Sequence, residues 1–501
     1  MKNTSSLDKI GLLLIITSSV LLGIWATMNT IALRNILLAI GGLLAIAYWW
    51  NEFAKNKAVP AAAPIAKPAP LKNTMLTWIA IALIGIMFLW VVAHYIFFSQ
   101  NPDQQWGELR STWLRAFVAV LIGSATGLAL NRDSRFTPIL WLGLFMSFVF
   151  LIGQYIPKAL LKHSMFAVDW FGDYIYWAKF HGVLAGTLLI AGLLGLLVDR
   201  FYFNNNHEGN IYKKTTLDSN SDGKRTSPSF RLSYFLMAYA VLGICIAAYS
   251  FVFVFDAKAG LGMLIILIGF WVFLGALALM AKVVFGKNKR ISLASLSRIL
   301  LIVTVVGIPL FWVSANHIKN NPGWESLFED VRIGVQIDKY KHWTDPALGF
   351  PVRADGKGVA GNTYERASLA SAGLRVITLE PIGSGALRSF RDQINKYVPG
   401  YKSHPYTHSA WIDLGLTFGL PGLLLLPAAL LLILVNAFRD TSLRNRGMII
   451  SLALAFLILY SVGEYGFQHS IEILFYIAGL LCGLSLVRHP IANDQYLQKP
   501  D

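Results

Sequence analysis

The chain has 501 residues, of which 55% are hydrophobic and 14% are charged, and its mean hydropathy is +0.55. A single soluble core cannot bury this much apolar surface, so the composition excludes a soluble globular protein and predicts an all-α polytopic membrane protein. The formal net charge of +16 is concentrated in alternate loops. That pattern is a topology signal in membrane proteins, so nucleic-acid binding is not needed to explain the charge.

Apolar stretches of about 17 to 25 residues, long enough to cross a bilayer, recur along the chain. We expect twelve transmembrane helices, near residues 10–27, 31–50, 75–98, 113–130, 138–157, 177–198, 233–255, 259–281, 298–315, 409–435, 447–462 and 470–487. Lysine and arginine gather in the loops that follow the even-numbered helices, and the positive-inside rule then places both termini in the cytoplasm. Gly123 and Gly127 are expected to serve helix packing. Cys245 and Cys482 fall inside predicted spans, so no disulfide framework is expected.

The outward loop 316–408, between predicted helices nine and ten, is long enough to be a small folded unit. It divides the chain into helices one to nine (1–315), a mainly helical loop domain (316–408), and helices ten to twelve with a cytoplasmic tail (409–501). Asn321-Pro322 is a good helix start. The helix that follows should lay one apolar stripe on the membrane or on the bundle, made of Trp324, Leu327, Phe328, Val331 and Val335.

A second helix is predicted from about Tyr364 to Glu380, and it ends at Pro381-Ile-Gly383-Ser-Gly385. A further segment follows with Arg388. Two glycines that open a helix let backbone N–H groups point at an anion, and a nearby guanidinium can add two parallel hydrogen bonds to phosphate oxygens. We therefore expect an anion-binding turn at Gly383 and Gly385.

Arg366 and Arg375 lie on this second predicted helix, nine residues apart. At about 100° per residue they point in directions about 180° apart if the helix is straight. Both cannot serve one site without a bend. We expect one of them to face a cavity and the other to face solvent or lipid headgroups.

A histidine pair, His404 and His408, precedes the tenth predicted span. If the helix includes His408, then Gly415 and Gly419 lie within about 20° of its face and Gly422 within about 40°. One stripe would then carry an imidazole at the water boundary and a groove without side chains below it. Such a groove admits a helix or a lipid chain. The plainer alternative for His408 is a hydrogen-bonded interfacial anchor.

These motifs resemble the O-antigen ligase and polymerase superfamily, which includes protein O-oligosaccharyltransferases. The resemblance rests on Arg366, on Pro381-Ile-Gly-Ser-Gly, and on His408-Ser409 followed after nine residues by Gly419-Leu-Pro-Gly422. Arg375-Val-Ile-Thr-Leu379 also fits a pattern of that family. Lys258 stands where the family has an arginine, which keeps the charge but loses the planar fork.

The resemblance implies a glycosyltransferase in the bacterial inner membrane, with its active site on the periplasmic face. An O-antigen ligase transfers a glycan from undecaprenyl diphosphate to a lipid A-core hydroxyl, with inversion and without a metal or cofactor. His408 would then be the catalytic base, and Arg366, Arg375 and Lys258 would bind the diphosphate. Possible secondary residues are His404, Arg388 and Glu464.

Other functions remain open from the sequence. Within the same chemistry, a polymerase would use a second carrier-linked glycan as acceptor, and an oligosaccharyltransferase would use a protein hydroxyl. The alternative outside enzymes is a transporter of lipid-linked glycans, which predicts charged residues along a path through the bilayer. Besides donor and acceptor, membrane lipids are the only partners expected, and the sequence does not predict an oligomeric state.

Overall fold

The computed structural model describes residues 6–25, 30–57, 72–162, 175–200, 228–255, 257–285, 312, 315, 318–319, 324–463 and 468–486. Over these residues the chain is helical, and its only extended pairing is one isolated β-bridge. Eight of the described helices are long and apolar enough to cross a membrane, and three more are apolar but shorter. The prediction of an all-α polytopic membrane protein is therefore confirmed.

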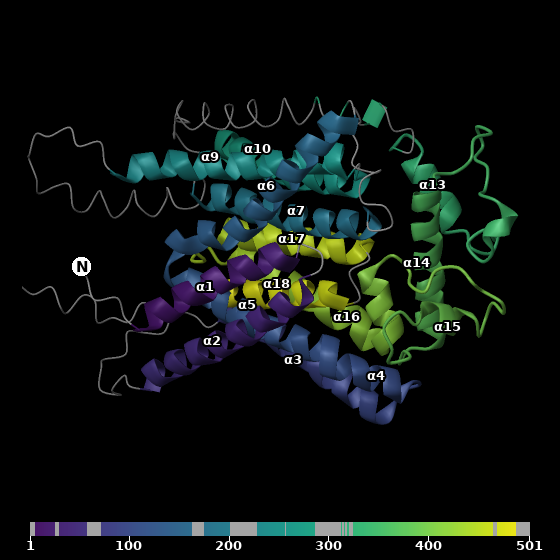
Figure 1. Cartoon of the computed structure of the whole chain (residues 1–501), viewed down its shortest axis with the longest axis horizontal. Coiled ribbons are helices and arrows are strands. Elements are labelled where there is room, and N and C mark those ends of the chain that lie inside the picture. The colour runs from purple at the N-terminus through teal and green to yellow at the C-terminus, as the bar shows by residue number, and fades with distance from the viewer. Residues whose placement is uncertain are drawn as a thin grey trace, which may run out of the picture.

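Eleven of the described helices form the bundle in Figure 1, in which α2 and α3 are inclined to the others. They are α1 (Ser6–Trp25), α2 (Ile31–Lys57), α3 (Lys72–Phe97), α5 (Leu114–Arg132), α6 (Thr137–Lys162), α7 (Ile175–Val198), α9 (Pro228–Tyr249), α10 (Lys258–Phe285), α16 (Ala410–Arg439), α17 (Arg446–Val462) and α18 (Gln468–Ser485). Each falls on one of the predicted apolar stretches. The remaining stretch, 298–315, lies almost entirely outside the described residues.

Among the described helices, α5 and α18 make the most extensive contact, and glycine makes it possible. A Cβ atom on Gly123 or Gly127 would collide with the backbone of α18, and one on Gly479 or Gly483 would collide with the backbone of α5. Small residues at this spacing let two membrane helices approach until their backbones touch. The packing role predicted for Gly123 and Gly127 is confirmed.

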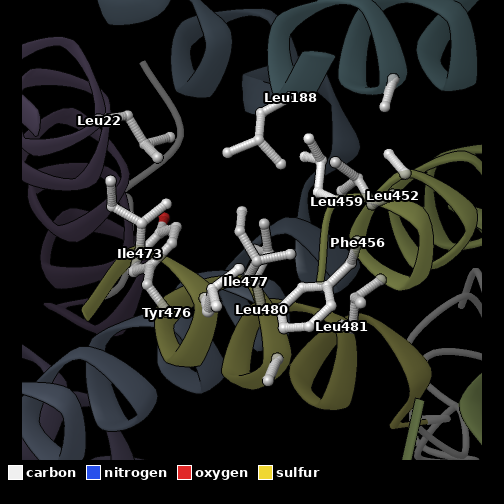
Figure 2. Close-up of a cluster of buried hydrophobic side chains, with 14 of the residues drawn as sticks. Leu22, Leu188, Leu452, Phe456, Leu459, Ile473, Tyr476, Ile477, Leu480 and Leu481 are labelled. Atoms are coloured by element: carbon white, nitrogen blue, oxygen red, sulfur yellow. The ribbon is translucent and has the colours of Figure 1, made fainter. Parts of the chain in front are cut away.

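Helix α18 runs through the centre of the bundle and buries large apolar side chains on several sides. Figure 2 shows Ile473, Ile477 and Leu480 of α18 facing side chains from three other helices. Those partners come from α1, α7 and α17, and include Leu22, Leu188 and Phe456. A position at the centre of the bundle explains why the C-terminal helix contacts elements from the whole length of the chain.

The segment 324–408 crosses one end of the bundle and has a buried cluster of its own. Its helices are α13 (Leu327–Gly334), α14 (Gly361–Leu379) and α15 (Phe390–Ile394), which stand across the ends of the bundle helices in Figure 1. The short helix α4 (Pro102–Glu108) lies at the same end. The buried cluster of this segment continues into the first turns of α16.

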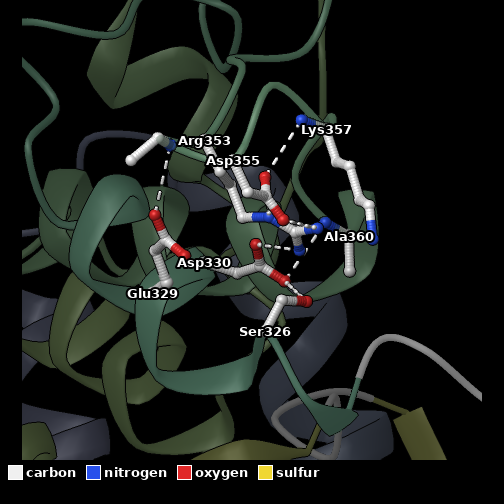
Figure 3. A network of polar contacts seen from close by, with 8 residues as sticks. Ser326, Glu329, Asp330, Arg353, Asp355, Lys357 and Ala360 are labelled. Atoms are coloured by element: carbon white, nitrogen blue, oxygen red, sulfur yellow. Dashed lines mark hydrogen bonds and ion pairs between the residues drawn. The ribbon is translucent and has the colours of Figure 1, made fainter.

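A buried carboxylate organises the start of this segment. Asp330 is fully buried; it accepts hydrogen bonds from Ser326 Oγ at 2.7 Å, from the backbone N–H of Ala360 at 3.2 Å and from Arg353 Nη1 at 3.4 Å. Figure 3 shows these groups converging on the carboxylate from separate parts of the loop. Because a buried charge is costly unless it is paired, this network ties α13 to the segment that leads into α14.

The apolar stripe predicted for the first loop helix does not point inward. The side chains of Phe328, Val331 and Val335 are exposed, whereas α13 buries Asp330, Ile333 and Gly334. Helix α13 packs on α14 through this second face, where Gly334 lies against the backbone of Tyr364. Of the two predicted contacts for the stripe, packing on the bundle is therefore wrong for these three side chains, and contact with the membrane stays a prediction.

Candidate functional site

Helix α16 is broken close to its start. Its N-cap is Ser409, so His408 lies before the helix, with a positive φ of 61°. A second discontinuity lies at Phe418 (φ −121°, ψ 15°) and Gly419 (φ 67°, ψ −152°). The prediction that His408 and the glycines share one helical stripe was therefore wrong, because the helical register is interrupted twice. The expected groove is also filled, since Ile377 packs over Gly415.

The loop after α14 satisfies the backbone groups that the break in α16 leaves free. Pro421 has no N–H, so the carbonyl of Thr417 lacks its helical donor and accepts the N–H of Gly385 at 2.7 Å. Pro381 O accepts the N–H of Leu420 at 2.9 Å. The same loop satisfies the carbonyl of Leu416 through Ser384 N at 3.1 Å. The carbonyl of Phe418 accepts instead from Trp90 Nε1 of α3, at 2.9 Å.

The motif glycines pack backbone against backbone at this junction. A Cβ on Gly383 would lie 2.5 Å from the nitrogen of Gly419, and a Cβ on Gly419 would collide with the carbonyl of Pro381. Gly422 lies in the same way against the carbonyl of Leu414, across the break. The N–H of Gly383 donates to Glu380 at 3.1 Å. The anion-binding turn predicted at Gly383 and Gly385 is therefore wrong, because the N–H groups it needs are used inside the protein.

We expect Gly419→Ala to abolish most of the folded protein. An alanine there would occupy a φ and ψ region that is essentially restricted to glycine, at a cost of about 1–3 kcal/mol, and would also collide with Pro381. The matched control is Gly356→Ala, which has a similar positive φ of 79° and open space around it. Thermal unfolding in detergent measures both. Equal Tm values for the two variants would contradict this account.

His408 lies in a cluster of polar side chains at the start of α16. Its ring centroid is 4.8 Å from that of His404 and 5.1 Å from that of Tyr406. Arg366 Nη1 donates to the carbonyl of His408 at 3.4 Å and to that of Val462 at 2.6 Å. Arg366 therefore joins α14 to the start of α16 and the end of α17. We call the residues Arg366, Arg388, His404, Tyr406, His408 and Asp413 the His408 cluster.

The imidazole of His408 is held neutral. It is 7% exposed, and burial, followed by the positive charge of Arg366 and by His404, lowers its pKa to about 2. Burial also lowers the pKa of His404, although Glu365 opposes this effect from a distance of 4.0 Å. The imidazole is therefore unprotonated at physiological pH, with its acceptor nitrogen available, but it is a weak base in this state.

Arg388 supplies the second guanidinium of the cluster. It adopts a positive φ of 59°, and its Cζ lies 5.7 Å from the ring centroid of Tyr406. Burial lowers the pKa of Arg388, and electrostatic interactions with Tyr406 and Asp413 partly offset this. Asp413 Oδ1 accepts the backbone N–H and the hydroxyl of Thr407, each at 2.8 Å. Asp413, in the first turn of α16, thereby fixes Thr407, the residue that precedes His408.

The two arginines of α14 face in different directions, as their spacing predicts. Arg366 contacts His408, whereas Arg375 is exposed and donates two hydrogen bonds to Asp338, at 2.8 and 2.6 Å. Lys258 is the exposed first residue of α10, and none of the described contacts joins it to the cluster. Glu464 lies outside the described residues. Of the three predicted diphosphate ligands, only Arg366 is therefore beside His408.

Two members of the cluster were missed in the sequence. Asp413 is an acid inside an apolar stretch, and that alone is a reason to expect a functional or structural partner. Tyr406 carries no comparable signal, because an aromatic residue near a membrane surface is common. Arg388 was predicted only as a secondary residue, since its turn back toward His408 depends on how the loop folds.

Across the described residues, no three His, Cys, Asp or Glu side chains gather closely enough to hold a metal ion. A scan against protein-family models finds no match to the chain, and a search of curated proteins finds none either. The resemblance to the ligase and polymerase superfamily therefore rests on the motifs around Arg366, His408 and Gly419.

Proposed function

We propose that the protein is an integral-membrane glycosyltransferase of the O-antigen ligase type, which transfers a glycan from undecaprenyl diphosphate to a lipid A-core hydroxyl. The observation that carries the proposal is the contact of Arg366 with a buried, neutral His408 at the end of a broken membrane helix. A cation and a proton acceptor side by side are what transfer from a diphosphate to a hydroxyl requires.

In this mechanism the acceptor hydroxyl gives its proton to His408, and its oxygen attacks the anomeric carbon of the donor. The bond from that carbon to the diphosphate oxygen breaks, and undecaprenyl diphosphate leaves with the electron pair. A single direct attack inverts the anomeric centre. Arg366 and Arg388 stabilise the charge that develops on the diphosphate, in place of the Arg375 and Lys258 first expected.

Donor binding activates the base in this mechanism. With a pKa of about 2, His408 is a weak base in the free enzyme. A diphosphate beside Arg366 brings negative charge close to the imidazole, offsets the effect of the guanidinium and raises the pKa of His408. The base therefore becomes effective only when there is a donor to react with.

This coupling predicts different pH dependences for two kinetic constants. Because kcat/KM reports the free enzyme, it should show no loss from protonation of His408 as the pH falls from 8 to 5. The kcat reports the donor complex, in which the diphosphate raises the pKa of His408. The acid limb of kcat should therefore lie at higher pH than any acid limb of kcat/KM. Initial rates in purified protein over this range measure both. An acid limb near pH 6.5 in kcat/KM that disappears in His408→Gln would contradict a depressed pKa.

The topology that belongs to this proposal has twelve transmembrane helices in the bacterial inner membrane, with both termini in the cytoplasm and the segment 316–408 in the periplasm. The half-buried Arg366 and the buried proton acceptor beside it support transfer over transport. A pure transporter of lipid-linked glycans has no need of a proton acceptor beside a cation at one membrane face.

Purified protein mixed with carrier-linked glycan and lipid A-core tests the proposal. Product formed without nucleotide, ion gradient or added metal supports a ligase. Product only with a second carrier-linked glycan would point to a polymerase, and product on a protein Ser or Thr to an oligosaccharyltransferase. Movement of the donor across a vesicle membrane without any product would overturn transferase activity altogether.

A further inference from the structure

Two layers of charged residues bracket the apolar part of the bundle. In one layer, Arg132 of α5 contacts Asp8 of α1 at 2.9 Å and Glu52 of α2 at 3.4 Å. In the other layer, Arg34 of α2 and Arg115 of α5 contact Glu472 of α18. Arg34 and Glu52 are eighteen positions apart along α2, a rise of about 27 Å. This matches the hydrocarbon core of a bilayer, about 30 Å thick, so both layers lie at headgroup level.

The layer around Glu472 lies at the same membrane face as the His408 cluster. Helix α18 begins at Gln468, shortly after Gly463, whose carbonyl accepts the N–H of Ala410 at the start of α16. Glu472 is in the second turn of α18. The N-terminal ends of α16 and α18 therefore share one face of the bundle.

The two layers have opposite charge balances. The Arg132 layer has one arginine for two acids, whereas the Glu472 layer has two arginines for one acid. Glu472 is fully buried, and its oxygens accept Arg115 Nε at 2.6 Å and Trp25 Nε1 at 3.3 Å. Within the described residues, the two arginines and one acid of the Glu472 layer thus leave a net charge of +1.

The excess charge belongs to guanidinium groups with hydrogen-bonding capacity to spare. The Arg34 side chain is 9% exposed and its Nε lies 3.4 Å from Glu472, but Nε makes no hydrogen bond with the described residues. Arg115 uses its Nε on Glu472, and its side chain is 28% exposed. Each guanidinium carries five N–H donors. A buried cation with unused donors at headgroup level favours an anion with several acceptor oxygens.

We propose that Arg34 and Arg115 form a binding site for the phosphate of an anionic phospholipid. A phosphodiester carries one negative charge, which equals the excess in the Glu472 layer, and its free oxygens can accept N–H donors from both guanidinium groups. The lipid acts as a structural ligand that neutralises the layer and stabilises the contact of α2 and α5 with α18. This inference is independent of the proposed transferase activity.

Thermal unfolding of delipidated protein in uncharged detergent tests the site. Titration with phosphatidylglycerol should raise the Tm of the wild type to a plateau, because a ligand that binds only the folded state stabilises it by mass action. Phosphatidylcholine has the same phosphodiester but also a quaternary ammonium that cancels its charge, so it should bind more weakly and give no plateau over the same range. Arg34→Gln and Arg115→Gln should each weaken the apparent affinity at least tenfold. The matched control, Arg132→Gln, breaks two ion pairs in the opposite layer and should leave the lipid response unchanged.

A second variant keeps the test decisive if Arg34→Gln or Arg115→Gln fails to fold. Glu472→Gln raises the excess from one positive charge to two, so phosphatidylglycerol should bind at least threefold more tightly, whereas a purely structural triad predicts a lower Tm with no gain in affinity. Equal lipid responses in the wild type and Arg115→Gln would overturn the site. An equal plateau with inorganic phosphate alone would show that a free anion, and not a lipid, is the ligand.

Discussion

Replacing His408 with alanine is expected to lower the rate of glycan transfer by about 10²- to 10⁴-fold, which is the usual contribution of a positioned general base. Donor affinity should survive, because Arg366 and Arg388 remain to bind the diphosphate. Single-turnover rates and donor binding, both measured on purified protein, separate the two effects. The measured loss should therefore appear in kcat and leave the Kd of the donor nearly unchanged.

A suitable control for losing a buried imidazole is His342→Ala. His342 is 6% exposed, close to the 7% of His408, and its ring lies 3.9 Å from that of Phe350 within the loop segment. That variant should lower the Tm and leave kcat within a few-fold of the wild type. Turnover at the wild-type rate by His408→Ala would remove the base from the mechanism.

Arg366→Ala and Arg375→Ala are expected to differ sharply, although both residues lie on α14. Arg366 contacts His408, and removing a cation that stabilises developing charge typically costs about 10²- to 10³-fold in kcat. Arg375 is 52% exposed and pairs with Asp338, and an exposed ion pair contributes only about 0–1 kcal/mol to stability. Transfer rates at saturating and at limiting donor concentration measure the difference.

Arg366→Lys should restore only part of the activity, because lysine keeps the charge but loses the planar fork. Since Arg366 also donates to the carbonyl of Val462, the Tm of each variant must be measured beside its rate. Arg375→Ala is the matched control on the same helix. Equal losses of activity in both alanine variants would contradict the assignment of Arg366 to the donor site.

Helical periodicity and apolar length could be predicted from the sequence because both are local properties. The opposite directions of Arg366 and Arg375 follow from about 100° per residue, and the structure has them so. The close approach at Gly123 and Gly127 follows from the absence of a Cβ atom. Every described bundle helix lies on a predicted apolar stretch, since a hydrocarbon interior leaves the backbone few alternatives to a helix.

The structure of the candidate site depended on contacts between residues far apart in the chain. The sequence predicted an anion-binding turn at Gly383 and Gly385 and a groove at Gly419. It did not show that the loop at Gly383 would donate to the carbonyls freed at Gly419. A glycine that binds an anion and a glycine that touches another backbone look the same in one sequence. For the same reason, the sequence predicts separate sites at the Gly383–Gly385 turn and at Gly419, although the two lie against each other in the structure.

The sequence by itself determined that this is an all-α membrane protein and which residue types are available beside His408. Only the tertiary structure decided that Arg388 joins the His408 cluster and that Arg375 does not. The physical reason is the break in α16: once Gly419 and Pro421 interrupt the helix, its free carbonyls have to find donors elsewhere. The loop that supplies those donors carries Arg388 back toward His408, and no local pattern specifies that path.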